Sequence, residues 1–519
     1  MSSIVCSTLS FSWPDDTPVF TGLSLTVPAG RTGLVAANGA GKSTLLRLIT
    51  GELRPAAGSV TVHGTLGYLP QDLPFTGTQS VAQLLGVDRT IAALHAIESG
   101  DAAEEHFTAV GSDWDVEERT RAELDRLGLG DVALDRRLDT LSGGEIVSLG
   151  LVAQLLRHPD VLVLDEPTNN LDRAARARLA GVVRGWAGCL LVVSHDRELL
   201  EEMDRIAALD HGEIRWYGGA FTAYEEGLRA EREAAAQQLR TAEQDLKRQK
   251  RELQQARERS QRRASTAARG LADAGLARLF AGNMKNSAQV SAARTSDVHA
   301  SRVAAAQARR DQADRAARQD DRIALDLPGT RIPAGRTVFE GAGLIIRGPE
   351  RIALTGANGA GKTTLLRLVE RSVAPAVGRV ASLSQRLDLL DPGRTVAQCL
   401  ADAAPGRTDA ERMTLLARFL FRGDRVHLPI RVLSGGERLR ATLACVLFAE
   451  PAPQLLLLDE PTNNLDLVSV AQLESALVAY EGAFVVVSHD ERFLSAIGVN
   501  RRIRLEKGRL TSDGRHAPE

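Results

Sequence analysis

The same ordered set of short motifs occurs twice along this chain. Leu-Ser-Gly-Gly-Glu stands at residues 141–145 and again at 433–437; a glycine-rich loop precedes each copy, and Asp-Glu-Pro-Thr-Asn-Asn-Leu-Asp follows it at 165–172 or 459–466. A serine and two glycines at the start of a helix present hydroxyl and N–H groups to an anion. That anion must be held by a facing surface, so the chain is predicted to fold as two similar domains that face each other.

The offset between equivalent positions of the two halves changes along the chain. Lys42 matches Lys362 at an offset of 320, whereas Ser142 matches Ser434 at an offset of 292. The repeat is therefore a whole domain and not a short solenoid unit. Because the offset falls between these two pairs, the first half contains an insertion ahead of its Ser-Gly-Gly motif, and we expect it in the stretch 101–123.

Short aliphatic runs alternate with longer helical patterns in each half. Residues 161–164, 190–193 and 455–458 contain only Leu and Val. Such continuous runs are typical of parallel strands that are buried on both faces by helices. The predicted fold class is α/β, and the motifs fall at strand ends, where ligands of such sheets bind.

The segment 228–322 differs in composition from both halves. Glycine and proline become rare at its start, and Leu239, Leu246 and Leu253 recur every seven residues. This spacing is typical of a helix that packs along one partner helix. We expect one helix over residues 228–262 and a second that returns to about residue 322, so that the two form an antiparallel hairpin.

The hairpin divides the chain into three predicted domains. Glycines and asparagines within residues 263–292 favour turns and helix caps, so this stretch is expected to form the hairpin tip. The first repeat is expected at 1–227, the helical linker at 228–322 and the second repeat at 323–519.

Charge is distributed unevenly although the formal net charge is only −2. Residues 247–310 contain 15 Lys/Arg against 4 Asp/Glu, which leaves −13 on the rest of the chain. A basic hairpin can be a solvated spacer, because charge runs often are; Arg and Lys also bind phosphates. RNA is the predicted partner, and the single tip aromatic, Phe280, argues against extensive base stacking.

The cysteines and the apolar residues exclude several classes of protein. Cys6, Cys189, Cys399 and Cys445 lack Cys-x-x-Cys spacing, which indicates neither a disulfide framework nor a zinc site and fits a reducing cytosol. No apolar run approaches the ~20 residues of a membrane span, and residues 1–6 lack the pattern of a secretion signal. We expect a cytoplasmic protein without a membrane partner.

The glycine-rich loop ahead of each Ser-Gly-Gly motif resembles a phosphate-binding loop. Residues 356–363 read Gly-Ala-Asn-Gly-Ala-Gly-Lys-Thr; the glycines let the backbone wrap the phosphates of ATP, Lys362 bridges the β and γ groups, and the Thr363 hydroxyl reaches Mg²⁺. In the first half, Ala36 replaces the leading glycine. Its Cβ costs strain if that position requires a positive φ, yet the rest of the loop is kept, so we expect ATP binding to persist.

An acidic pair follows an aliphatic run in each half. These buried strands are expected to bring the carboxylates to the nucleotide. Asp165 and Asp459 should orient the Mg²⁺ shell, while Glu166 and Glu460 should polarise the attacking water, because phosphoryl transfer mainly requires positioning and charge stabilisation.

A histidine and a glutamine complete each predicted site. His195 and His489 follow Glu166 and Glu460 at the same spacing, each within Ser-His-Asp. This matched spacing favours contacts with the γ-phosphate and the water over the role of a core histidine. Gln71 and Gln385 are placed to sense Mg²⁺ and the same water.

The nucleotide and metal sites can be stated residue by residue. Trp13 is a candidate for adenine stacking, with a packed surface aromatic as the equal alternative, and its second-half counterpart around 325–328 has no aromatic. Expected nucleotide contacts are Trp13, Asn38, Gly39, Gly41, Lys42, Ser43, Thr44, Gln71, Ser142, Gly143 and Gly144 in the first half, and Gly356, Asn358, Gly359, Gly361, Lys362, Thr363, Thr364, Gln385, Ser434, Gly435 and Gly436 in the second. Expected Mg²⁺ contacts are Ser43, Gln71, Asp165, Thr363, Gln385 and Asp459.

Taken together, these motifs resemble the ABC-F family of ATPases over nearly the whole chain. Two ATP-binding cassettes share one polypeptide with a charged helical linker, and residues 216–224, Trp-Tyr-Gly-Gly-Ala-Phe-Thr-Ala-Tyr, are similar to that family's aromatic–glycine signature. The resemblance implies a monomer whose cassettes close head to tail over two ATPs. Each Ser-Gly-Gly signature would then complete the opposite site, and Asp172 and Asp466 would communicate between the sites.

The resemblance also implies a ribosomal partner. Family members bind the ribosome at the tRNA exit site, where the linker reaches toward peptidyl-tRNA and the peptidyl-transferase centre, and some confer antibiotic resistance by ribosome protection. We favour that branch over a housekeeping translation factor. A DNA-binding repair ATPase remains an alternative, whereas an exporter's energy subunit is not favoured.

Two departures from the repeat fall on the same site. The first signature continues with Glu145-Ile146-Val147-Ser148, whereas the second continues with the more polar Glu-Arg-Leu-Arg. The apolar tail and the missing aromatic both belong to the site of Lys362, so we hypothesise that the two sites hydrolyse ATP unequally.

Overall fold

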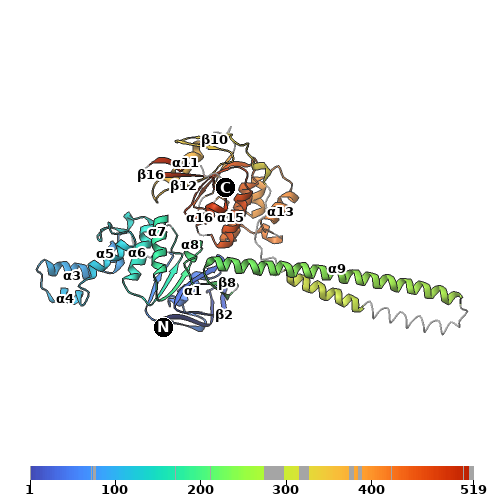
Figure 1. The fold of residues 1–519 in the computed structure, drawn as a ribbon, viewed down its shortest axis with the longest axis horizontal. Helices are drawn as coiled ribbons and strands as arrows, with labels where there is room; N and C mark the ends of the chain where they lie inside the picture. Colours follow the sequence, from blue (N-terminus) through green and yellow to red (C-terminus); the bar gives the residue numbers. More distant parts are fainter. Residues whose placement is uncertain are drawn as a thin grey trace. The chain divides into compact units, whose positions relative to one another are not determined.

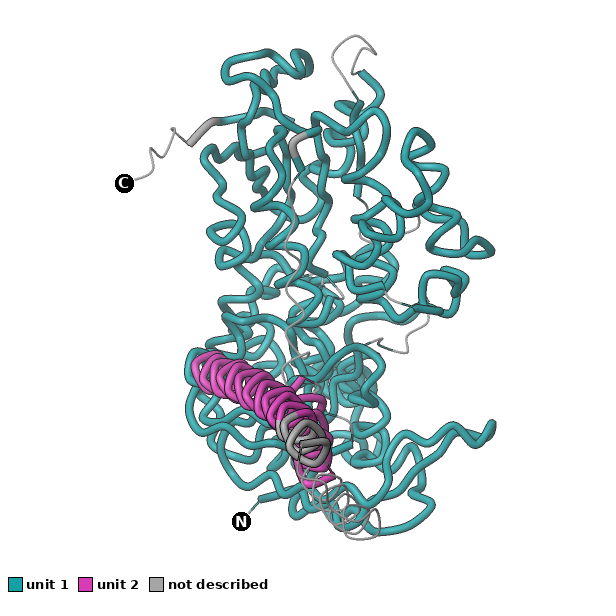
Figure 2. Tube along the Cα trace, turned by 90° about the vertical axis from the view of Figure 1, so that its right-hand side faces the viewer, with its two compact units in different colours: residues 1–224, 322–519 teal, residues 225–321 magenta. Residues whose placement is uncertain are grey.

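The chain forms two compact units, residues 1–224 with 322–519 and residues 225–321, coloured separately in Figure 2. The computed structural model describes residues 2–71, 73, 78–169, 171–210, 212–273, 297–314, 327–372, 379–383, 389–421, 423–463, 465–506 and 508–513. Both cassettes lie in the first unit and most of the linker forms the second. No helix in these ranges is long and apolar enough to cross a membrane.

The first cassette is built on a six-stranded sheet with the order β5-β6-β7-β3-β8-β9. All neighbouring strands are parallel except the pair β8–β9. Every residue of β6 and β7 is buried because both faces are covered, as predicted for α/β strands. The strands are β3 (Gly30–Ala36), β5 (Leu66–Leu69), β6 (Val161–Asp165), β7 (Cys189–Val193), β8 (Arg205–Asp210) and β9 (Glu213–Gly218).

A second, antiparallel sheet belongs to the first cassette and was not anticipated. It has the order β2-β1-β4 and is made by β1 (Ser3–Ser12), β2 (Pro18–Val27) and β4 (Ala57–His63). Buried and exposed residues alternate along much of β1 and β2, so one face of this sheet packs into a core that it shares with the parallel sheet. The helices of this cassette are α1 (Lys42–Ile49), α2 (Val81–Leu85), α3 (Asp88–Glu98), α4 (Glu104–Val110), α5 (Val116–Arg126), α6 (Gly143–Leu155), α7 (Arg173–Arg184) and α8 (Arg197–Leu200).

The second cassette repeats the central sheet with the order β13-β14-β15-β12-β16-β17, in which only β16–β17 is antiparallel. Its strands are β10 (Thr337–Gly341), β11 (Leu344–Arg347), β12 (Arg351–Thr355), β13 (Arg379–Leu383), β14 (Pro453–Asp459), β15 (Ala483–Val487), β16 (Arg501–Glu506) and β17 (Arg509–Asp513). Its helices are α11 (Lys362–Ser372), α12 (Val396–Ala403), α13 (Asp409–Arg418), α14 (Gly435–Leu447), α15 (Leu467–Ala479) and α16 (Glu491–Ala496). Equal strand order confirms the predicted fold class.

The insertion in the first cassette is the pair α3–α4, and its expected place at 101–123 was partly wrong. Helix α5 corresponds to α13, because Leu124 and Leu416 are both fully buried and keep the offset of 292. In the second cassette only residues 404–408 separate α12 from α13. The insertion therefore starts near residue 88, and the small apolar face of α3 made this helix look like an ordinary part of the cassette.

The linker begins as one helix of 53 residues, α9 (Phe221–Asp273), seen as the long green helix in Figure 1. At 1.5 Å per residue it is about 80 Å long. The expected end at residue 262 was wrong: one glycine within a run of good helix formers, such as Gly270, costs only ~1 kcal/mol. The expected tip lies otherwise outside the described residues.

A second linker helix spans residues 297–314 and pairs with α9 in antiparallel fashion. Arg309 forms an ion pair with Asp245 at 3.0 Å, while the neighbouring Arg310 interacts with Glu243, so the numbering of the two helices runs in opposite directions. Ala306 is 1% exposed, which shows that its side chain lies in the seam between the helices. The expected hairpin is present in the described part of the linker, and the exact domain boundaries stay a prediction.

Candidate active site

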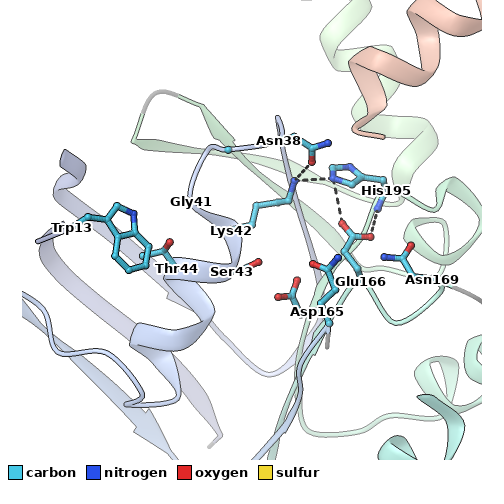
Figure 3. A pocket seen from close by; sticks show the side chains of 12 residues that line it. Trp13, Asn38, Gly41, Lys42, Ser43, Thr44, Asp165, Glu166, Asn169 and His195 are labelled. Atoms are coloured by element: carbon cyan, nitrogen blue, oxygen red, sulfur yellow. Dashed lines mark hydrogen bonds and ion pairs between the residues drawn. The ribbon is translucent and has the colours of Figure 1, made fainter. Parts of the chain in front are cut away.

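The phosphate-binding loop of the first cassette connects β3 to α1 and holds a buried lysine. Gly41 takes a left-handed conformation with φ of 95° and precedes the first turn of α1. The Lys42 ammonium donates to the Ala36 carbonyl at 3.0 Å and to Asn38 Oδ1 at 3.3 Å, and lies 2.8 Å from His195 Nε2 (Figure 3). Burial lowers the pKa of Lys42. The ammonium is thus held by neutral acceptors at the place where a phosphate charge would be favourable.

The two acidic pairs follow the buried strands β6 and β14, as the sequence predicts. Asp165 and Asp459 are the last residues of these strands, and Glu166 and Glu460 come next with φ of 48° and 44°. Left-handed backbone at a residue other than glycine costs ~1–3 kcal/mol and is concentrated at functional sites. Burial raises the pKa of Glu166 to about 8 and that of Glu460 to about 7.

Each glutamate lies against the histidine of the Ser-His-Asp motif downstream of it. His195 Nε2 is 3.3 Å from Glu166 Oε1, and His489 Nε2 is 3.4 Å from Glu460 Oε1. Burial lowers the pKa of His195 to about 3 and that of His489 to about 4, with further lowering by the adjacent lysines. Both histidines are therefore neutral at physiological pH, so these contacts are not ion pairs.

The site residues of the first cassette line one cavity of about 340 Å³, a volume typical of small-molecule sites. Trp13 lies at one end of it, and Glu166 lies at the other end beside Asn169 (Figure 3). Asn169 was missed by the sequence reasoning, although it belongs to the Pro-Thr-Asn run that follows Glu166. The lining is Trp13, Asn38, Gly39, Gly41, Lys42, Ser43, Thr44, Gln71, Asp165, Glu166, Asn169 and His195.

The lysine of the second cassette has the same kind of surroundings as Lys42, but the first residue of its phosphate-binding loop has a different backbone conformation. Lys362 donates to the carbonyls of Gly356 at 2.7 Å and Ala357 at 3.2 Å, and lies 3.4 Å from His489 Nε2. Gly356 has φ of 148°, whereas Ala36 ends strand β3 without a positive φ. The strain foreseen for Ala36 is thus avoided by a different backbone. Asn358, Gly359, Gly361, Thr363 and Thr364 lie in the described part of this loop and helix, and Gln385 lies outside the described residues.

Both signatures cap long helices. Ser142 precedes α6 and Ser434 precedes α14, and each serine exchanges hydrogen bonds with the glutamate three residues later. The following glycines, Gly143 with Gly144 and Gly435 with Gly436, form the first turn of each helix. These are N-terminal turns of 13-residue helices, where free N–H groups and the helix dipole favour a phosphate.

Residues of opposite cassettes meet at the first phosphate loop. The backbone N–H of Asn38 donates to Asp466 Oδ2 at 2.7 Å. A Cβ added at Gly435 would lie 3.7 Å from the side-chain nitrogen Nδ2 of Asn38, so the second signature is next to this loop. At the second site, burial lowers the pKa of Lys362, and the charge of Asp172 from the first cassette partly offsets this lowering. These contacts agree with composite sites, and the role of each residue in ATP handling stays a prediction.

Comparison with known proteins identifies the family. The family described as ABC transporter matches residues 20–169 and 339–463. The tylosin resistance ATP-binding protein TlrC of Streptomyces fradiae is 34% identical over 93% of each chain. The probable ATP-binding protein YheS of Escherichia coli K12 is 30% identical over 90% of this chain and 73% of its own. This chain belongs to the ABC-F family. An RNase-L inhibitor structure shares the fold with TM-score 0.54 and 19% identity, covering 93% of this chain and 85% of that one.

As a tandem ABC-F protein, the chain binds and hydrolyses ATP. The residues of the first cavity also fit the Mg²⁺ that usually accompanies ATP, because Ser43, Gln71 and Asp165 bring hydroxyl, amide and carboxylate oxygens to one lining. In the described ranges no group of three or more His, Cys, Asp or Glu side chains could hold a metal. Mg²⁺ is often held by one or two carboxylates with water and substrate phosphates.

A nearly buried ion pair joins the two ABC-F cassettes. Arg197 contacts Glu474 at 2.7 and 3.4 Å, with 11% and 15% of the side chains exposed. Arg197→Ala should lower the free energy of unfolding by about 3 kcal/mol, because it leaves the buried Glu474 charge without this cation. Urea denaturation followed by tryptophan fluorescence measures the change. The control Arg173→Ala removes a cross-cassette pair whose arginine is 76% exposed and should cost less than ~1 kcal/mol; equal losses would contradict the prediction.

Proposed function

We propose that this ABC-F ATPase binds the ribosome, that its linker enters the tRNA exit site and acts near the peptidyl-transferase centre, and that it confers antibiotic resistance by ribosome protection. The relationship to TlrC, whose name states tylosin resistance, carries this proposal because it extends over 93% of both chains. The region of similarity to TlrC therefore includes the linker as well as the two cassettes.

The charge of the linker supports a polyanionic partner. Residues 247–310 carry 15 Lys/Arg and 4 Asp/Glu on a hairpin whose described part is helical. Arg248 and Arg309 are 69% and 64% exposed although each contacts Asp245, so their guanidinium groups are accessible to phosphates. Ribosomal RNA, and peptidyl-tRNA at the exit site, carry many negatively charged phosphates that would attract this positively charged linker.

The proposed cycle uses the two composite sites. The first pairs Lys42, Glu166 and His195 with Ser434, and the second repeats this arrangement with the opposite signature, Ser142. Neutral His195 can accept or donate a hydrogen bond at the γ-phosphate without adding charge, and the glutamate orients the attacking water. ATP favours the closed cassettes and thereby the ribosome-binding form, whereas hydrolysis releases the protein. Mg²⁺ would neutralise phosphate charge at Ser43 or Thr363 and the adjacent carboxylates.

A tylosin susceptibility test decides the resistance role. A sensitive host that expresses the chain should tolerate several-fold more tylosin than the same host with an empty vector. Replacing residues 263–292 by a Gly/Ser segment of equal length should abolish this tolerance and leave ATP hydrolysis intact. Unchanged susceptibility to tylosin and to a wider drug panel, with ribosome binding retained, would favour a housekeeping translation factor. Nuclease-sensitive recovery of DNA in place of ribosomes would favour the repair ATPase.

A further inference from the structure

The first turn of linker helix α9 is held by a carboxylate that is shared between the cassettes. Glu201, which follows α8, accepts hydrogen bonds from the Thr222 backbone N–H at 3.2 Å and from the Thr222 hydroxyl at 2.9 Å. The same carboxylate accepts a 3.0 Å hydrogen bond from Arg492 of the second cassette. Thr222 is the second residue of α9, so this network fixes the start of a helix that continues without a break into the linker.

Arg492 also contacts an aromatic residue of the same turn. Its guanidinium lies 5.8 Å from the ring centre of Phe221, within the range of cation–π attraction. Phe221 is 2% exposed and packs in the core of the first cassette. Arg492 therefore touches α9 both through Glu201 and through Phe221, and α9 has no freedom to turn at its start without disturbing these contacts.

Arg492 belongs to a segment that reaches the second ATP site. It stands three residues after His489, which lies beside both Lys362 and Glu460 at 3.4 Å. Between them, Asp490 caps helix α16 by accepting from the Phe493 backbone N–H at 2.8 Å. The segment is thus a short, internally bonded element with the phosphate lysine at one end and the start of α9 at the other.

The two cassettes carry opposite charges at the position of Arg492, and this difference can be related to where the linker begins. At the offset of 294 that relates His195 to His489, Arg492 corresponds to Glu198, and Glu491 corresponds to Arg197. The order of charge is reversed. Only the second cassette therefore presents a cation from this turn to Glu201 and the linker start, which follow the first cassette in the chain.

We propose that Arg492 is a positioning residue that couples the nucleotide state of the Lys362 site to the first turn of linker helix α9. When a γ-phosphate draws Lys362 and His489 toward itself, the short segment shifts as a unit and Arg492 transmits the shift to Glu201, Thr222 and Phe221. The purpose of this movement, delivery of the linker to RNA, rests on the proposed function; the coupling itself does not.

Hydrogen–deuterium exchange tests the coupling in the full chain without ribosomes. In a chain carrying Glu166→Gln and Glu460→Gln, ATP with Mg²⁺ should slow exchange of the amides of residues 221–232 by about fivefold or more, the lower range of coupling between sites. Adding Arg492→Ala should abolish this difference while ATP affinity is unchanged. Arg492→Lys should retain it, because a lysine can keep the ion pair with Glu201.

Arg173→Ala is the matched control, because Arg173 bonds to Glu491 across the same cassettes at 3.1 Å but does not contact Glu201, Thr222 or Phe221. It should keep the nucleotide-dependent difference. The proposal is overturned if ATP has no effect in the parent chain, if Arg492→Ala keeps the effect, if Arg492→Lys loses it, or if Arg173→Ala loses it equally. Failure to bind ribosomes with a normal exchange response would instead overturn only the proposed function.

Discussion

Replacing Glu166 and Glu460 together with glutamine should lower ATP turnover by about two to four orders of magnitude, the usual contribution of a positioned general base. Glutamine keeps the size of the side chain and one oxygen, so the backbone with φ of 48° and 44° is preserved. Lys42 and Lys362 remain in place, and ATP should therefore still bind. The variant should stay in its ATP-bound form and co-sediment with ribosomes in ATP but not in ADP.

Phosphate release and ribosome sedimentation measure the two effects separately. The matched control is Glu198→Gln, an exposed carboxylate three residues after His195 that should leave turnover unchanged. The two single variants compare the sites, and we expect unequal residual rates because the apolar signature tail and the missing aromatic both fall on the Lys362 site. A double variant that hydrolyses ATP normally would contradict the glutamate roles, and one that is inactive yet remains in the supernatant would contradict the ribosomal partner.

Gly356→Ala should weaken ATP binding at the second site by roughly 5- to 150-fold, equivalent to the ~1–3 kcal/mol of a strained backbone. Gly356 has φ of 148°, and a Cβ there would lie 2.5 Å from the Leu505 carbonyl oxygen. That contact is with backbone of the central sheet, so it cannot be relieved by a rotamer change. The loop would have to shift, and with it the carbonyl that accepts from Lys362 at 2.7 Å.

The repeat supplies the control for this substitution. Ala36→Gly makes the inverse change where the backbone has no positive φ, so it should change ATP affinity less than twofold, within the small effect of added backbone freedom. Titration with nucleotide should use chains that also carry Lys42→Ala or Lys362→Ala, so that one site is observed at a time. Equal affinities of the two variants at their own sites would show that the difference between the loops has no effect on binding.

The local motifs allowed much of the site to be predicted because each motif fixes its own backbone. Aliphatic runs produced the buried strands that end at Asp165 and Asp459, and Ser-Gly-Gly-Glu produced the caps of α6 and α14. The heptad leucines indicated a helix with one partner. Each of these features depends on residues within a few positions of one another, where periodicity and capping are strong signals.

Other features of the site and of the linker are not marked by any single residue or short motif. Asn169 reaches the cavity because of the turn after Glu166, and the continuation of α9 beyond residue 262 depends on helix propensity summed over many residues. The insertion was misplaced because α3 has an apolar face of its own. A single residue type indicates neither the helix propensity of a long segment nor the direction in which a turn carries the chain.

By itself, the sequence determined that two ATP-binding halves share one chain, which residues form their phosphate loops, and that a basic helical hairpin connects them. Only the tertiary structure decided that Ala36 escapes a strained φ, that Asp466 bonds to the opposite loop, and that Arg492 meets Glu201 at the start of α9. The physical reason is the distance along the chain over which each kind of interaction acts. Capping, periodicity and loop chemistry act between neighbours in the chain, whereas the contacts of Asp466 and Arg492 join residues hundreds of positions apart and exist only after the sheets have packed.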